Sequence, residues 1–285
     1  MTASETPVTL GPETLAGQVA IVTGGGSGIG RATVLELAAA GATVVTCGRR
    51  LEPLCETVAL GPAGAIEAIE RDIREEAEVD ALVNRVLESH GQIDLLVNNA
   101  GGQFLSPAED ITAKGFRTVI RLNLEGTWLM THAVATRAFI PSGAGGKVIS
   151  VTLTPHAGLP GMAHSSAARA GVENLMKVLA IEWARFGIRL TAVAAGVIGT
   201  ETFHSKYPQQ LIETLGESIP LGRLGRPEEI AQMIAFLASP AGDYITGTVI
   251  TVDGGHDVYQ GRYPPRGLAV GSGKPVAEPR RRASS

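Results

Sequence analysis

Residues 19–30 read VAIVTGGGSGIG, a short run of β-forming residues that passes directly into a glycine-rich turn. The residues that follow, RATVLELAAA, have the composition of a helix. Glycines let the backbone turn sharply and approach a pyrophosphate, and the start of a helix presents free N–H groups and the positive end of its dipole. The strand–turn–helix context therefore predicts a phosphate-binding turn for a dinucleotide. An ordinary glycine-rich connection is the alternative.

Short β-rich runs alternate with longer helical stretches along the chain. The runs are 19–22, 43–47, 65–69, 94–98, 147–151, 189–194 and 248–252. Strands separated by helices build βαβ units and a parallel sheet covered on both faces. We therefore expect an α/β fold over residues 17–257, with a single Rossmann-type, doubly wound, seven-stranded parallel sheet. Residues 1–16 are expected to form a flexible leader, and 258–285, rich in Gly, Pro and Arg, an irregular or disordered tail.

Two helices of this pattern have clear signals. In one, apolar residues recur at three- and four-residue spacing, which predicts the buried stripe of an amphipathic helix. These residues are Ala168, Val172, Leu175, Leu179 and Trp183. In the other, Pro227 is followed by two glutamates, which predicts a helix start with acids on the positive end of the dipole.

The composition excludes several classes of protein. Hydrophobic residues make up 44% of the 285 residues and charged residues 18%, so the chain can bury a core. Lys and Arg number 24 against 28 acidic residues, and this balance gives no reason to expect a nucleic-acid partner. The chain has no apolar run of membrane-spanning length, no secretory signal and two cysteines, so we expect a cytoplasmic protein without a membrane partner. No His/Cys cluster has the spacing of a zinc site.

The end of the second β-rich run indicates which dinucleotide is bound. An acidic residue at this position would bind the ribose hydroxyls of NAD, but the run ends in Gly48, Arg49 and Arg50. Two guanidiniums suit a 2′-phosphate, so the sequence predicts NADPH. Two solvated arginines that begin a helix are the alternative.

These motifs together resemble the short-chain dehydrogenase/reductase family. The family's Thr-Gly-x-x-x-Gly-x-Gly is matched at 23–30, its Asn-Asn-Ala-Gly at 98–101, and its last strand by ITGTVITVDGG at 245–255. The resemblance covers about residues 17–257 and implies a nicotinamide cofactor, with Asp72 placed against the adenine. The residues that we expect to bind the cofactor are Thr23, Gly24, Ser27, Gly28, Ile29, Gly30, Arg49, Arg50, Asp72, Ile73, Asn99, Ala100, Gly101, Arg169 and Val197.

The chain departs from the family at the catalytic helix. The family uses Tyr-x-x-x-Lys there, with a serine before it, and this frame falls on Ser165, Arg169 and Thr152. The tyrosines of the chain are Tyr207, Tyr244, Tyr259 and Tyr263. All lie beyond that helix, so no shift of the alignment restores the pattern. Asn123, in RLNLEGT, matches the family's active-site asparagine, and the expected catalytic residues are Asn123, Thr152, Ser165 and Arg169.

Two further stretches narrow the resemblance. GGQFLSPAEDI at 101–111 and AHSSAARAGVENLMK at 163–177 are similar to peroxisomal trans-2-enoyl-CoA reductases and 2,4-dienoyl-CoA reductases. This implies an NADPH-dependent reductase of the carbon–carbon double bond of an enoyl or dienoyl thioester, so an acyl-CoA thioester is the expected small-molecule substrate. The enolate formed needs hydrogen-bond donors at its oxygen, which Ser165 or Thr152 would supply. We expect Glu173 to be a solvated helix residue.

Two other functions stay open. Because the tyrosine and lysine are missing, the chain could be a catalytically inactive subunit that binds NADP(H). It could also be a carbonyl reductase or alcohol dehydrogenase with a non-standard proton donor, for which His164 is a candidate, as are His204 and Tyr207 in the expected substrate lid at 200–222. The resemblance also implies a homo-oligomer, either a tetramer or a dimer.

Overall fold

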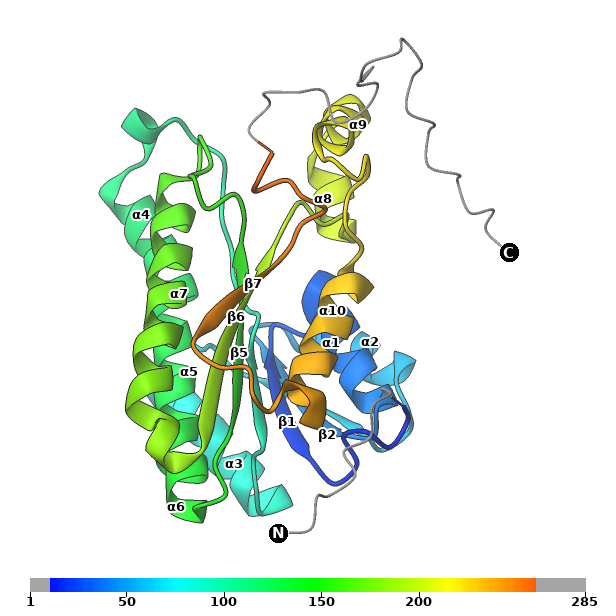
Figure 1. Cartoon of the computed structure of the whole chain (residues 1–285), viewed down its shortest axis with the longest axis vertical. Helices are drawn as coiled ribbons and strands as arrows, with labels where there is room; N and C mark the ends of the chain where they lie inside the picture. The colour runs from blue at the N-terminus through cyan, green and yellow to red at the C-terminus, as the bar shows by residue number, and fades with distance from the viewer. Residues whose placement is uncertain (1–10, 260–285) are drawn as a thin grey trace, which may run out of the picture.

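A seven-stranded parallel sheet runs through the centre of the computed structural model, which describes residues 11–259 (Figure 1). The strands lie in the order β3-β2-β1-β4-β5-β6-β7. Their bounds are β1 Val19–Thr23, β2 Thr43–Gly48, β3 Ile66–Glu70, β4 Leu95–Asn98, β5 Gly146–Leu153, β6 Ile188–Ala195 and β7 Thr248–Val252. All neighbouring strands pair in parallel, so the predicted α/β fold is confirmed.

Helices cover both faces of this sheet (Figure 1). One face carries α1 (Gly28–Ala39), α2 (Leu51–Leu60) and α10 (Pro227–Ala238); the other carries α3 (Glu76–His90), α4 (Ala113–Ile120), α5 (Gly126–Val134), α6 (Ile140–Ser142) and α7 (Ala163–Trp183). Successive residues of β1 enter opposite cores: Val19 and Ile21 pack toward α3, α5 and α7, while Ala20 and Val22 pack toward α1 and α10. This two-sided burial explains why the strand is apolar throughout.

The two helices with clear sequence signals form as predicted. In α7, Ala168, Val172 and Leu179 are buried, and Leu175 and Trp183 pack against the same core. Helix α10 begins at Pro227, and the carboxylate of Glu229 accepts a hydrogen bond from the N–H of Arg226 at 2.8 Å. Both signals act within one helical turn, which is why they can be read from the sequence.

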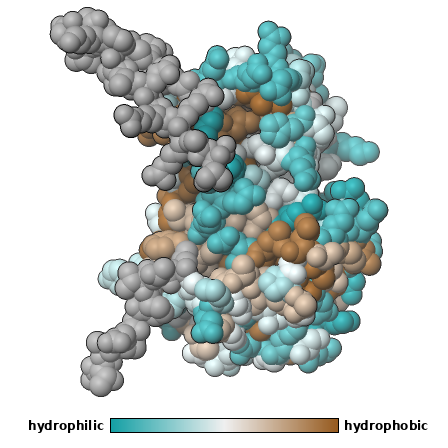
Figure 2. Space-filling view, turned by 90° about the vertical axis from the view of Figure 1, so that its right-hand side faces the viewer, coloured by the Kyte–Doolittle hydropathy of each residue, from teal (hydrophilic) through white to brown (hydrophobic). Residues whose placement is uncertain are grey.

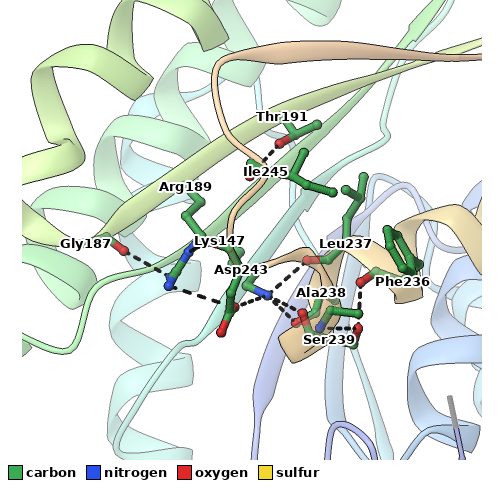
Figure 3. Close-up of polar contacts among 11 residues, drawn as sticks. Lys147, Gly187, Arg189, Thr191, Phe236, Leu237, Ala238, Ser239, Asp243 and Ile245 are labelled. Carbon is green, nitrogen blue, oxygen red and sulfur yellow. Dashed lines mark hydrogen bonds and ion pairs between the residues drawn. The ribbon is translucent and has the colours of Figure 1, made fainter. Parts of the chain in front are cut away.

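One lysine ties the start of β5 to the end of α10 (Figure 3). Lys147 Nζ donates hydrogen bonds of 3.0, 2.9 and 2.6 Å to the carbonyl groups of Leu237, Ala238 and Ser239. It also forms a 2.8 Å ion pair with Asp243. A helix end leaves such carbonyls without partners, so Lys147 caps α10. Burial lowers the pKa of Lys147, and the hydrogen bond to Asp243 opposes this shift.

The described part of the chain begins and ends beside the sheet. Leu15, within the predicted leader, is buried, and its N–H donates to the carbonyl of Ala40 at 2.8 Å. The packed chain therefore begins before residue 17, where the sequence placed the domain boundary. Residues 1–10 and 260–285, which include most of the predicted leader and tail, lie outside the described residues.

In the part of the chain that the structure describes, no helix is long and apolar enough to cross a bilayer. On the face that Figure 2 turns toward the viewer, hydrophobic and hydrophilic residues are interspersed.

The direction in which the strands are added reverses between β1 and β4. The chain moves outward from β1 to β3 on one side and from β4 to β7 on the other. Such a switch opens a crevice at the carboxyl ends of the strands. Beside it, α4 continues through a π-helical turn, Arg121–Glu125, into α5, and this wide turn holds the buried Asn123.

Candidate active site

A cavity of about 700 Å³ lies at this crevice. It brings together most of the residues that the sequence assigned to the cofactor, namely Gly24, Ser27, Gly28, Ile29, Gly30, Arg49, Asp72, Ile73, Asn99, Ala100, Gly101, Arg169 and Val197. Thr152 also lines the cavity. Thr23, Arg50, Asn123 and Ser165 are not part of its lining, so their contacts are described separately.

The glycine-rich turn between β1 and α1 forms one end of the cavity. Gly24 has a φ of 73°, which L side chains rarely adopt, and a Cβ there would lie 2.9 Å from the Cα of Ala100. Ser27 precedes α1, and its side chain makes no capping hydrogen bond. The first N–H groups of the helix are therefore available to an anionic ligand.

Basic side chains gather where β2 and β3 end. Arg49 and Arg71 line the cavity, whereas Arg50 precedes α2 at an exposed position outside the lining. The Nε of Arg71 is buried without a hydrogen-bond partner. Asp72 is held by Arg74, with Nε 2.9 Å from Oδ1, and this hydrogen bond lowers the pKa of Asp72. Sequence reasoning missed Arg71, whose signal was its position directly before Asp72.

Two predicted site residues hold the loop after β4 instead of lining the cavity. Thr23 Oγ1 accepts hydrogen bonds from the N–H groups of Asn99 and Ala100, both at 3.0 Å. The amide of Asn123 pairs with the backbone of Gly102: its Oδ1 accepts at 3.0 Å and its Nδ2 donates at 2.8 Å. Both side chains therefore fix the backbone of the loop after β4, which lines the cavity.

The guanidinium of Arg169 reaches the cavity from α7. Its Nη1 donates to the carbonyl of Val151, and its Nε is buried without a partner. A Cβ on Gly101 would collide with this guanidinium, so glycine at that position makes room for it. Burial lowers the pKa of Arg169 to about 10, against the effect of the nearby Glu173, so the group stays charged at neutral pH.

A buried donor without a partner is rare in a folded protein and suits a polar ligand group. Arg71 and Arg169, which both line the cavity, each have such a donor in their Nε. The chemistry of these residues therefore fits an anionic dinucleotide with free ribose hydroxyls.

Ser165 does not open on the cavity. It is fully buried, and its Oγ donates to Oε1 of Gln103 at 2.9 Å. Gln103 itself lines the cavity, so the hydroxyl contacts that space only through the Gln103 amide. His164 is also fully buried; its Nδ1 accepts from the N–H of Ser165 at 2.7 Å, and its ring packs edge-on against Phe104. Sequence reasoning missed Gln103, although it lies within the stretch GGQFLSPAEDI that narrowed the resemblance.

The prediction that Glu173 is solvated is wrong. Only 9% of Glu173 is exposed, because its side chain turns toward β5 and not toward solvent. Its Oε1 accepts a hydrogen bond from Thr152 Oγ1 at 2.8 Å and lies 3.2 Å from Nε2 of His156. Asp257, after β7, accepts hydrogen bonds of 2.6 Å from both the N–H and Nδ1 of His156. The pairing of His156 with Asp257 has no signal in the sequence, because the two residues are 101 positions apart.

Two short helices cover the remaining side of the cavity. They are α8 (Glu201–Lys206) and α9 (Gln209–Ser218), within the predicted lid. Phe203, Tyr207 and Leu215 line the cavity together with Met162, whereas His204 does not. This wall is mostly apolar and suits an acyl chain. Within residues 11–259, no cluster of His, Cys, Asp and Glu is placed to hold a metal ion.

The chain is similar to several oxidoreductases. A family described as enoyl-(acyl carrier protein) reductase matches residues 24–257. A peroxisomal 2,4-dienoyl-CoA reductase of Arabidopsis thaliana is 34% identical, over 90% of this chain and 89% of its own. The 3-oxoacyl-[acyl-carrier-protein] reductase FabG of Thermotoga maritima is 37% identical, over 85% and 98%. The solved structure of the citronellol catabolism dehydrogenase AtuB of Pseudomonas aeruginosa is 41% identical, over 86% and 97%, with a TM-score of 0.77.

Proposed function

Because the chain belongs to the short-chain dehydrogenase/reductase family, we propose that it is an NADPH-dependent reductase of the carbon–carbon double bond in an enoyl or dienoyl thioester. The likeness to 2,4-dienoyl-CoA reductases supports this substrate class. The apolar wall from Phe203 and Leu215 also supports it, because an acyl chain needs such a surface.

One observation carries the proposal: Thr152 and Arg169 face the cavity, and no tyrosine stands at the family's position on α7. Carbonyl reduction builds charge on an oxygen that must itself be protonated, so it depends strongly on the tyrosine. Hydride addition to an enoyl thioester instead gives an enolate, which hydrogen-bond donors at its oxygen stabilise. Loss of the tyrosine therefore harms double-bond reduction less.

The residues of the cavity divide among the parts of the cofactor. The glycine-rich turn and the start of α1 would bind its pyrophosphate. Arg49 and Arg71 would bind the 2′-phosphate, and Arg169 the ribose hydroxyls next to the nicotinamide. When bound, the cofactor supplies the hydride. Asn123 and Thr23 keep the loop after β4 in place around it.

Carbonyl reduction is the second candidate, and two observations favour it. FabG of Thermotoga maritima, a 3-oxoacyl reductase by name, is 37% identical. In addition, Tyr207 lines the cavity from the lid and could protonate an oxygen there. An inactive subunit that binds NADP(H) is the remaining alternative. We also propose that the protein is cytoplasmic and forms a homo-oligomer, a dimer or tetramer.

The experiment is to follow NADPH oxidation with a series of trans-2-enoyl-CoA and 2,4-dienoyl-CoA thioesters, with 3-ketoacyl thioesters in parallel. We expect turnover on the enoyl or dienoyl thioesters only. Turnover on ketones alone would establish the carbonyl reductase instead. Tight NADPH binding without turnover on any of these substrates would favour the inactive subunit or a substrate class outside this series.

A further inference from the structure

Four polar side chains form a continuous line from the cavity to the segment after β7. Thr152 lies at the cavity, Glu173 behind it on α7, His156 in the loop between β5 and α7, and Asp257 beyond that loop. The three steps between them measure 2.8, 3.2 and 2.6 Å. The side chain of Glu173 is 11% exposed, that of His156 34% and that of Asp257 19%, so the line reaches solvent at His156. The line therefore connects a buried hydroxyl to solvent.

The geometry at Glu173 decides what Thr152 can do. One oxygen, Oε1, faces both the Thr152 hydroxyl and Nε2 of His156. While the carboxylate is ionised, the Thr152 hydrogen points at Glu173 and cannot also point at a substrate. Once Glu173 carries a proton, it can donate to Thr152, and the Thr152 hydrogen becomes free for the cavity.

We propose that Asp257, His156 and Glu173 form a proton relay that makes Thr152 the acid of this site, in place of the missing tyrosine. Thr152 is then the catalytic residue, because it lines the cavity in which the substrate would bind. The other three act through it as positioning residues. The substrate named here rests on the proposed function, whereas the relay itself rests on the contacts of the four residues.

The step balances as a chain of proton transfers that follows hydride addition. The Thr152 O–H bond breaks as its proton passes to the enolate oxygen of the thioester. Thr152 takes a proton from Oε1 of Glu173, which has received it from Nε2 of His156 and so returns to the carboxylate. His156 is left neutral, with its Nδ1–H on Asp257, and recovers a proton from water. These transfers leave an enol, which becomes the saturated carbon–carbon bond when its carbon takes a proton from water and its oxygen gives one back to water. The electrons of the reduction come from the hydride of the nicotinamide cofactor.

The neighbours of His156 favour the protonated form that the relay needs. The hydrogen bond to Asp257 is the main cause that raises the pKa of His156; burial opposes it, and the charge of Glu173 adds to it. Burial raises the pKa of Asp257, but the hydrogen bonds from His156 and the charges of His156 and His256 outweigh it and lower that pKa. Arg169 is the remaining charged group that faces Glu173. Turnover should therefore fall as pH rises through the raised pKa of His156.

The first test replaces the middle of the relay. Glu173→Gln keeps the shape of the side chain but cannot pass on a proton, so we expect kcat for the enoyl thioester to fall about 100-fold. NADPH affinity, measured by fluorescence titration, should stay unchanged. The matched control is Glu182→Gln, at an exposed position of the same helix, which should keep wild-type kcat. A Glu173→Gln enzyme with wild-type kcat would overturn the relay.

The second test is the pH profile, which a merely structural role would not move. In the wild type, kcat should fall on the alkaline side with an apparent pKa above the ordinary histidine value of about 6.5. Asp257→Asn should shift this limb to lower pH, and His156→Gln should leave kcat low and independent of pH. NMR titration of the His156 ring measures the same pKa without turnover.

The outcomes separate the relay from the proposed function. If the wild-type enzyme reduces enoyl thioesters and Asp257→Asn leaves the pH profile of kcat unchanged, the relay is overturned and the proposed function stands. If it reduces only 3-ketoacyl thioesters and the profile shifts, the relay stands and the substrate class is overturned. A His156 pKa at or below the ordinary value would overturn the relay whatever the substrate.

Discussion

At the scale of single residues, we propose that Arg49 sets which dinucleotide the cavity prefers. It lines the cavity where β2 ends. That strand end lacks the acidic residue that would bind the ribose hydroxyls of NADH. A charge-assisted hydrogen bond to a phosphate contributes about 1.5–3 kcal/mol. We therefore expect Arg49→Ala to weaken NADPH binding about 10- to 100-fold while NADH binding stays the same.

Fluorescence titration with both cofactors measures this effect. Arg85→Ala, which removes an exposed guanidinium on α3 that pairs with Glu67, is the matched control and should leave both affinities unchanged. Equal affinities of the wild type for NADPH and NADH would contradict the cofactor assignment. A small loss at Arg49 together with a large loss in Arg71→Ala would move the phosphate contact to Arg71.

The sequence predicted single residues well only where a backbone motif fixes them. The glycine-rich turn, Asn99 and Arg169 line the cavity as expected. The turn and Asn99 directly follow the ends of strands, and Arg169 was located by its spacing along a helix. The solvation of Glu173 was mispredicted and the contact of Ser165 with Gln103 was not foreseen, since the direction of a helix side chain depends on its partners from other elements; the catalytic role of Ser165 stays a prediction. Those partners, Gln103 and His156, come from loops that no periodic pattern describes.

Lys147 has a measurable role at the scale of elements. It caps the end of α10, which packs against α1 and thereby supports the glycine-rich turn. We expect Lys147→Met to lower the free energy of unfolding by about 2 kcal/mol, because the hydrogen bonds and the ion pair with Asp243 are lost. For a domain of this size, the melting temperature should fall by about 4–8 °C.

Thermal unfolding followed by circular dichroism tests this prediction. Lys177→Met, at an exposed position of α7, is the control and should melt at the wild-type temperature. NADPH affinity of the Lys147→Met protein should be unchanged, because Lys147 lies at the amino end of β5 and the cavity at the carboxyl ends. An unchanged melting temperature would show that α10 does not depend on this cap.

The strands and the core helices could be predicted because each is specified by its own local pattern. A strand buried on both faces is continuously apolar, and α7 repeats its apolar residues at helical spacing. The π-helical turn at Asn123 and the return of the segment after β7 to His156 have no such pattern. Both depend on contacts between distant parts of the chain, which appear only when the whole sheet is assembled.

At the scale of the whole molecule, exposed apolar side chains on α5 and α7 predict that the chain assembles with other copies. On α7, Ile181 is 81% exposed and Val178 43%, and on the neighbouring α5 Trp128 is 38% exposed. Both helices cover the same face of the sheet, and large apolar side chains exposed on such a face favour contact with another protein. The family resemblance implies that this protein is a second copy of the chain. We expect a dimer or tetramer in solution, measured by size-exclusion chromatography with light scattering.

Ile181→Glu should break this assembly into smaller species, because it places a charge in the proposed contact. Leu60→Glu is the matched control: Leu60 is 63% exposed on α2, which covers the opposite face of the sheet, so the assembly should persist. A monomeric wild type, or an Ile181→Glu protein of unchanged mass, would contradict the prediction. Ile181 is exposed and is not part of the lining of the cavity, so the dissociated variant should still bind NADPH, and this separates a failure to assemble from a failure to fold.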